Sequence, residues 1–189
     1  MASIEEALRL IGESACQDRA YLFEIHKEKS TDRVLMSQRC EWTSEGTEPE
    51  IGNPDLINVD ATNILPRWMT AFRQNEIIEG PVKSFPETEQ ALLLPQAIVS
   101  LLCVPIFDEK RLCGFIGFDN CHMNYRWTAE DKALLRTIAA AIGAAMGRQQ
   151  NLLQLQEGEE KFQKLINGNP AVAVQGFYED GRITFWNQA

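Results

Sequence analysis

Two neighbouring apolar segments constrain the fold of this chain more than any other feature. Residues 99–107 and 112–118 are both rich in Val, Ile, Leu and Phe, and the charged turn 108–111 joins them. Both segments are apolar on both faces, which is typical of central strands that are covered on both sides. We therefore expect two antiparallel strands at the centre of a sheet. Gly114 and Gly117 leave room in the second strand for close backbone approach, for a ligand or for a bend.

Shorter segments supply the rest of the fold. Helical spacing of apolar residues predicts a helix over 3–16, and alternation predicts two strands, 20–26 and 33–42, that form a hairpin. In the second of these strands the same spacing puts four residues on one face: Val34, Met36, Cys40 and Trp42. After a long loop, short helices are expected near 65–73 and 87–94. The predicted class is α+β, with helix 3–16 and a long exit helix on one face of an antiparallel sheet, and the short helices on the other.

The exit helix begins near Thr128, where Asp131 has capping-box spacing, and Gly158 is its first expected break. Two apolar stripes run along it, so one can serve the domain core and the other a partner helix. The alternative is a single wide stripe facing the core, followed by a solvated tail. The residues expected to form a seam between two copies of the chain are Leu134, Ala141, Ala145, Leu152, Leu155 and Phe162.

The last thirty residues have a different pattern. A short helix over 159–166 is followed by a hairpin pattern, in which the turn Asp180-Gly181 favours positive φ. A lone hairpin is marginally stable in water. We therefore expect this tail to be the start of a second domain that continues beyond the sequence.

Charge and cysteine usage narrow the classes of partner. The chain has 27 Asp and Glu against 18 Lys and Arg, a formal net charge of −9, which disfavours nucleic acid or an anionic membrane surface. No apolar run reaches the roughly 20 residues that span a bilayer, and the acidic start does not resemble a signal peptide. Five cysteines without CxxC spacing indicate reduced thiols. A cytoplasmic location is expected.

The order of these elements resembles a GAF domain over about residues 3–150. The motifs that carry the resemblance are Cys103-Val104-Pro105-Ile106, then Gly114-Phe115-Ile116-Gly117-Phe118-Asp119, then Trp127 and Asp131 at the start of the exit helix. The tail is similar to the start of a PAS domain through Asn169-Pro170, Asp180-Gly181 and Trp186-Asn187. The resemblance implies a GAF domain over 1–150, a connecting helix over 151–166 and a truncated start of a PAS domain over 167–189.

This series resembles the sensory half of a bacterial histidine kinase or of a cyclic-di-GMP enzyme. It implies a regulatory sensor and homodimerisation module, which passes a small-molecule or partner signal along residues 128–166 to an output domain downstream. The alternative is a stand-alone receptor for a small ligand, in which dimerisation is incidental.

No catalysis is expected in this chain itself. His26 and His122 are the only histidines, and neither a nucleophile elbow nor a phosphate-binding loop occurs. Some GAF domains reduce methionine sulfoxide with cysteines upstream of the penultimate strand, but here only Cys16 and Cys40 lie upstream, both far from that loop.

Comparison with cofactor-binding GAF domains disfavours a cyclic nucleotide, a bilin and haem. The cyclic-nucleotide type carries Asn-Lys after the last strand, where this chain has Asp119-Asn120. Phytochrome-like domains attach a bilin through a Cys before the penultimate strand, and residues 86–100 contain none. Cys121-His122 follows the last strand and lacks a third ligand for a metal. The sequence therefore predicts no cofactor and no metal.

What remains is a pocket for a small apolar or weakly polar ligand, or a core with no ligand. Pockets and cores use the same residue types, so the sequence leaves both open. The candidate lining residues between the sheet and the short helices are Trp42, Trp68, Phe72, Leu92, Leu94, Leu102, Val104 and Ile116.

Overall fold

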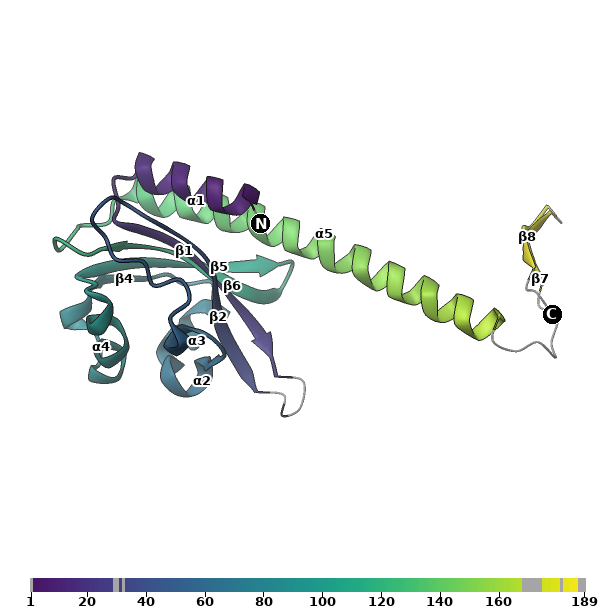
Figure 1. The fold of residues 1–189 in the computed structure, drawn as a ribbon, viewed down its shortest axis with the longest axis horizontal. Coiled ribbons are helices and arrows are strands. Elements are labelled where there is room, and N and C mark those ends of the chain that lie inside the picture. The colour runs from purple at the N-terminus through teal and green to yellow at the C-terminus, as the bar shows by residue number, and fades with distance from the viewer. Residues whose placement is uncertain (1, 29–30, 32, 168–174, 181, 187–189) are drawn as a thin grey trace. The chain divides into compact units, whose positions relative to one another are not determined.

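The domain is built on one six-stranded antiparallel sheet with the strand order β3-β2-β1-β6-β5-β4 (Figure 1). A computed structural model describes residues 2–28, 31, 33–167, 175–180 and 182–186. The strands of the sheet are β1 Arg19–Lys27, β2 Val34–Thr43, β3 Val59–Asp60, β4 Ile78–Pro81, β5 Ser100–Asp108 and β6 Arg111–Asn120. The α-helices are α1 Ala2–Ser14, α2 Ala61–Ile64, α3 Pro66–Arg73, α4 Glu87–Leu93 and α5 Ala129–Asn167. Single 3-10 turns cover Pro54–Leu56, Val82–Ser84 and Leu94–Gln96.

Helices cover both faces of the sheet, as expected from the two strands that are apolar on both faces. The prediction that both strands are central holds for β6, beside β1, but not for β5, which lies next to the edge strand β4. Figure 1 shows α1 and the first part of α5 on one face, and α2, α3 and α4 on the other. Strands β5 and β6 are buried over nearly all of their length. The sequence did not predict the short edge strand β3 or the helix α2, both of which lie in and after the long loop.

Alternation along the strands assigns each buried side chain to one of the two faces. Leu101, Cys103 and Phe115 belong to the hydrophobic cluster that packs against α3. Their neighbours Leu102 and Ile116 are buried but point to the opposite face, toward α1 and α5. The domain therefore has two cores, one on each side of the sheet.

A β-bulge in β2 changes the face on which its residues lie. Leu22 pairs with Cys40, whereas Phe23 pairs with Gln38, so Arg39 is the extra residue. The prediction of one apolar face along this strand is therefore wrong beyond the bulge. Met36 belongs to the cluster under α3, while Trp42 packs against Gly12 of α1 on the other side.

Helix α5 continues for 39 residues without a break. The expected interruption at Gly158 is wrong, because an exposed glycine in a helix costs only about 1 kcal/mol relative to alanine. In the tail, β7 Gln175–Phe177 pairs antiparallel with β8 Ile183–Trp186. The rest of the predicted tail pattern falls on residues 168–174, 181 and 187–189, outside the described residues.

Gly143 is a point of close approach between α5 and the sheet. A Cβ placed there would lie 1.9 Å from the carbonyl oxygen of Phe107 at the end of β5. Gly158 on the same helix has no atom within 4 Å of an added Cβ. The two glycines therefore make a matched pair for testing the packing of this helix.

We expect Gly143→Ala to lower the free energy of unfolding by about 1–3 kcal/mol or more, because the methyl group meets backbone that must shift. Gly158→Ala should raise stability by about 0.5–1 kcal/mol, because alanine is the better helix former. Urea unfolding of both variants measures the effects. Equal effects of the two substitutions would contradict this packing.

Candidate functional site

A pocket lies between the sheet and the helices α3 and α4. Its cavity volume is about 30 Å³, enough for one or a few water-sized groups. The lining residues come from β1, β2 and β6 on the sheet side and from α3, α4 and their flanking segments on the helix side. They are Tyr21, Phe23, Met36, Gln38, Glu41, Leu56, Leu65, Trp68, Leu92, Leu93, Gln96, Ile98, Phe115 and Asp119.

One end of the pocket is aromatic. Phe23 stacks on Phe115 across the paired strands β1 and β6, with ring centroids 4.8 Å apart. Trp68 meets Phe115 edge to face at 6.0 Å. These rings form a rigid apolar wall, because aromatic pairs hold defined geometries.

The other end of the pocket is polar. Tyr21 Oη donates a hydrogen bond to Asp119 Oδ1 at 2.8 Å, and Gln38 Nε2 donates to Glu41 Oε1 at 3.1 Å. The bulge at Arg39 puts Gln38 and Glu41 on the same face of β2, although residues three apart in a regular strand face opposite sides.

Gly117 makes room for this polar end. It pairs with Tyr21 across β1 and β6, and a Cβ there would lie 2.5 Å from the tyrosine ring. The bare backbone lets the Tyr21 ring lie across β6 and reach Asp119. The sequence left close backbone approach, a ligand or a bend open for Gly114 and Gly117. The structure shows close backbone approach at Gly114, where an added Cβ would lie 2.1 Å from the main-chain oxygen of Phe23, and space for a side chain at Gly117.

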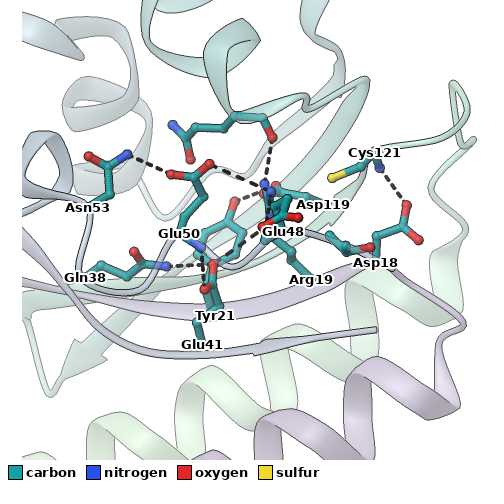
Figure 2. A network of polar contacts seen from close by, with 12 residues as sticks. Asp18, Arg19, Tyr21, Gln38, Glu41, Glu48, Glu50, Asn53, Asp119 and Cys121 are labelled. Atoms are coloured by element: carbon teal, nitrogen blue, oxygen red, sulfur yellow. Dashed lines mark hydrogen bonds and ion pairs between the residues drawn. The ribbon is translucent and has the colours of Figure 1, made fainter. Parts of the chain in front are cut away.

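Arg19 is the centre of the buried polar network behind the pocket (Figure 2). Its side chain is 2% exposed. Nε and Nη2 donate to the main-chain oxygen of Glu48 at 3.1 and 2.7 Å, and Nη1 donates to the main-chain oxygen of Gln96 at 2.9 Å. Three carboxylates lie 3.8–3.9 Å from its nitrogens, those of Glu41, Glu50 and Asp119.

Asp119 is a buried carboxyl group whose pKa is shifted to near neutral pH. Burial raises the pKa of its carboxyl to about 7 from an ordinary 3.8. The hydrogen bond from Tyr21 and the guanidinium of Arg19 oppose that rise, whereas the carboxylates of Glu41 and Asp18 add to it. Protonation of Asp119 near neutral pH therefore changes the charge at the pocket.

A buried carboxylate fastens the helices over the pocket. Glu89 of α4 is 1% exposed and accepts from Trp68 Nε1 at 2.9 Å. It also accepts from Arg67 Nε and Nη2 at 2.9 and 2.5 Å, and the Arg67 guanidinium lies 4.9 Å from the centre of the Phe85 ring. These bonds tie α3 to α4 and fix the Trp68 ring in the pocket wall.

A family model described as the GAF domain matches residues 2–146. The chain belongs to the GAF domain family. It is 40% identical over 163 residues to the methanogenesis regulatory histidine kinase FilI of Methanothrix harundinacea (strain 6Ac). That alignment covers 86% of this chain and 18% of the kinase, so the chain spans less than a fifth of this relative.

Solved GAF domains share the fold at lower identity. The photoproduct state of GAF3 from Slr1393 of Synechocystis sp. PCC6803 has a TM-score of 0.67 and 22% identity, covering 82% of this chain and 98% of that chain. A phycocyanobilin-bound GAF domain from a cyanobacterial phytochrome has a TM-score of 0.63 and 14% identity, covering 77% of this chain and 82% of that chain.

The bilin-bound structures correct one expectation about cofactors. The sequence comparison disfavoured a bilin, haem and a cyclic nucleotide because their attachment or binding motifs are missing. Structures with this same fold hold bilins, so the prediction that a bilin is disfavoured does not stand. Within the described residues, no group of three His, Cys, Asp or Glu is placed to hold a metal ion.

Two of the expected lining residues, Trp68 and Leu92, line the pocket of this GAF domain. Phe72 is fully buried behind it, in contact with the Trp68 and Phe115 rings. Leu94 is 46% exposed. Four others lie on the opposite face of the sheet: Trp42, Leu102, Val104 and Ile116.

The polar lining residues were not predicted from the sequence. The available signal was the presence of Arg19, Gln38, Glu41 and Asp119 within otherwise apolar strands.

Of the residues expected to form the seam on α5, Leu134 is partly buried, and Ala141 and Ala145 are exposed. The exposed fractions of the others are 61% for Leu152, 71% for Leu155 and 49% for Phe162. In the part of the chain that the structure describes, none of the helices is both long and apolar enough for a membrane span.

We expect Arg19→Met to lower the free energy of unfolding by about 3–5 kcal/mol, because it leaves buried carboxylates without their cation. Arg39→Met is the matched control. Arg39 forms a 2.7 Å ion pair with Glu24 that is 45% and 35% exposed, so its loss should cost at most about 1 kcal/mol. Urea unfolding compares the two variants. Similar losses would show that the network around Arg19 does not stabilise the fold.

Asp119 should make stability depend on pH. Its folded-state pKa of about 7 lies above the ordinary 3.8, so its stabilising contribution is full below pH 4 and is lost as the pH rises to about 7. The gap corresponds to at most about 4 kcal/mol. Asp119→Asn should remove this dependence, so the difference in unfolding free energy between variant and native chain should grow in favour of the variant from pH 4 to 8. Parallel pH profiles from urea unfolding would contradict the raised pKa.

Proposed function

We propose that this chain is the sensory input module of a histidine kinase and that its pocket receives a small-molecule signal. The relationship to a histidine kinase supports the first part. The observation that supports a small-molecule signal is the pocket itself. It is lined by aromatic rings at one end and by buried ionisable and hydrogen-bonding groups at the other. We expect the module to act in the cytoplasm.

The path from the pocket to α5 is short. Asp119 is the second-last residue of β6, and ten residues later the chain enters α5 at Ala129. Asp131 in the first turn accepts from the main-chain nitrogen and the hydroxyl of Thr128 at 2.8 and 2.9 Å, and from Tyr125 Oη at 3.2 Å. Asn120 Oδ1 at the end of β6 accepts from the main-chain nitrogen of Met123 at 2.8 Å, and the main-chain oxygen of Met123 accepts from Tyr125 N at 2.9 Å. A change at the pocket end of β6 can therefore reach the start of the helix through these hydrogen bonds.

We further propose that α5 relays the signal as the seam of a homodimer. Its residues 151–164 are all exposed, and the apolar side chains among them gain stability if a second helix covers them. A PAS domain that begins in the tail, 167–189, would receive this signal, and a cyclic-di-GMP enzyme is the alternative output. A stand-alone receptor is the other reading, and it does not require a dimer.

The double substitution Leu152→Asp with Leu155→Asp should convert the dimer to a monomer, because each aspartate replaces buried apolar area worth about 25 cal/mol per Å² with charge. Gln154→Asp with Gln156→Asp is the control, since it adds the same charge to the same helix turns without removing a leucine. Analytical ultracentrifugation measures the mass, and a cooperative melt checks folding. A dimer that survives the leucine substitutions would place the seam elsewhere, for example on α1.

A second candidate function is a bilin-based light sensor, which the bilin-bound structures of the same fold favour. Incubation with biliverdin and with phycocyanobilin, followed by gel filtration and absorbance spectroscopy, tests it. A visible band that elutes with the protein supports this candidate, and its absence with both pigments rejects it.

A further inference from the structure

The charges facing the pocket are unbalanced. Glu41 and Asp119 line it, and among the described lining residues there is no Lys, Arg or His. Arg19 lies behind them, but its hydrogen bonds go to the main-chain oxygens of Glu48 and Gln96. It remains 3.8–3.9 Å from the carboxylates and serves three of them at once. The site therefore has negative charge that one guanidinium does not neutralise.

The other contacts of Glu41 do not change this balance. Its Oε2 accepts from the main-chain nitrogens of Glu50 and Ile51 at 2.7 and 2.8 Å, and its Oε1 accepts from Gln38. These donors are neutral, so they satisfy the hydrogen bonds of the carboxylate without compensating its charge.

One residue that lines the pocket has a hydrogen-bond acceptor with no donor. Gln38 is 7% exposed, and its Oε1 is buried with no hydrogen-bond partner among the described residues. The orientation of this amide is fixed, because Glu41 can only accept and so requires the Nε2 group. A buried acceptor without a partner costs about 1–3 kcal/mol, and a ligand that donates a hydrogen bond would remove that cost.

The opposite wall and the size of the pocket restrict the ligand further. The rings of Phe23, Trp68 and Phe115 line the pocket, and the face of an aromatic ring attracts a cation through the ring quadrupole. The cavity volume of about 30 Å³ fits a group of few heavy atoms.

We propose that this pocket selects a small organic cation that carries N–H donors, of the amidinium, guanidinium or alkylammonium class. The cation lies between the aromatic wall and the carboxylates of Glu41 and Asp119, and it donates a hydrogen bond to Gln38 Oε1. This inference rests on the proposed function, because it names the chemical class of the signal that the module senses.

Three molecules of one shape separate charge from size. Acetamidinium, acetamide and acetate have the same planar skeleton but are cationic, neutral and anionic. Titration of the purified chain at constant ionic strength, followed by ligand-observed NMR and tryptophan fluorescence, should give acetamidinium a dissociation constant at least about tenfold lower than that of acetamide, with no binding of acetate. Equal binding of acetamide, or no saturable binding of acetamidinium, would overturn the proposal.

Variants locate the binding in this pocket. Gln38→Leu removes the unpartnered acceptor at similar volume. At pH 8, where Asp119 is ionised, Asp119→Asn removes a charge. Each variant should weaken acetamidinium binding at this pH by at least about tenfold. Glu24→Gln is the control, because Glu24 is a partly exposed carboxylate of the same sheet that pairs with Arg39 and does not line the pocket. Near-ultraviolet circular dichroism checks that the variants fold. Unchanged affinity in both pocket variants would overturn the assignment.

The ligand-binding test and the test of the proposed function can fail independently of each other. If a neutral or anionic molecule binds in this pocket and the leucine substitutions in α5 still abolish the dimer, the sensory proposal stands and the cation selectivity is wrong. If acetamidinium binds with the expected selectivity but the chain is monomeric, the selectivity stands and the relay through α5 is wrong.

Discussion

The burial of Arg19 is the interaction on which the site depends. Removing a guanidinium from water costs several kcal/mol unless its donors are satisfied and its charge is compensated. Here the donors reach main-chain oxygens in the long loop after β2 and in the segment after α4, and three carboxylates supply the charge. Both segments therefore take up fixed positions over β1, and the polar end of the pocket is assembled where they meet (Figure 2).

The two sides of the pocket are held in place by different interactions. On the sheet side, antiparallel strands fix Tyr21, Phe23 and Phe115 through backbone pairing. On the helix side, α3 and α4 are joined by the buried Glu89 and its bonds to Trp68 and Arg67. Side-chain packing and a few side-chain hydrogen bonds hold the helices, whereas continuous main-chain hydrogen bonds hold the strands. A ligand that enlarges the pocket would therefore move the helices first.

The fold of a GAF domain does not determine which ligand it binds. GAF domains with this fold hold a bilin, although they share 14% identity or less with this chain. One fold can carry many binding sites, and the chemistry of the site comes from the side chains that line it. In this chain those side chains are aromatic rings, two carboxylates and an amide with an unused acceptor.

The sequence by itself determined the class of fold and the order of its elements. Two-sided apolar runs identified β5 and β6 as adjacent strands inside the sheet, although β5 lies next to the edge strand β4 and only β6 is central. Helical periodicity identified α1, α3, α4 and the start of α5. The tertiary structure decided which side chains face the pocket. A strand that is apolar on both faces carries no signal of which face is which, so Leu102 and Ile116 could not be told apart from Leu101 and Phe115. The bulge at Arg39 brought Gln38 and Glu41 to one face, and only the packing of distant segments gave Arg19 its partners. Local periodicity indicates which side chains are buried. Which residues they pack against depends on contacts between segments far apart in the chain.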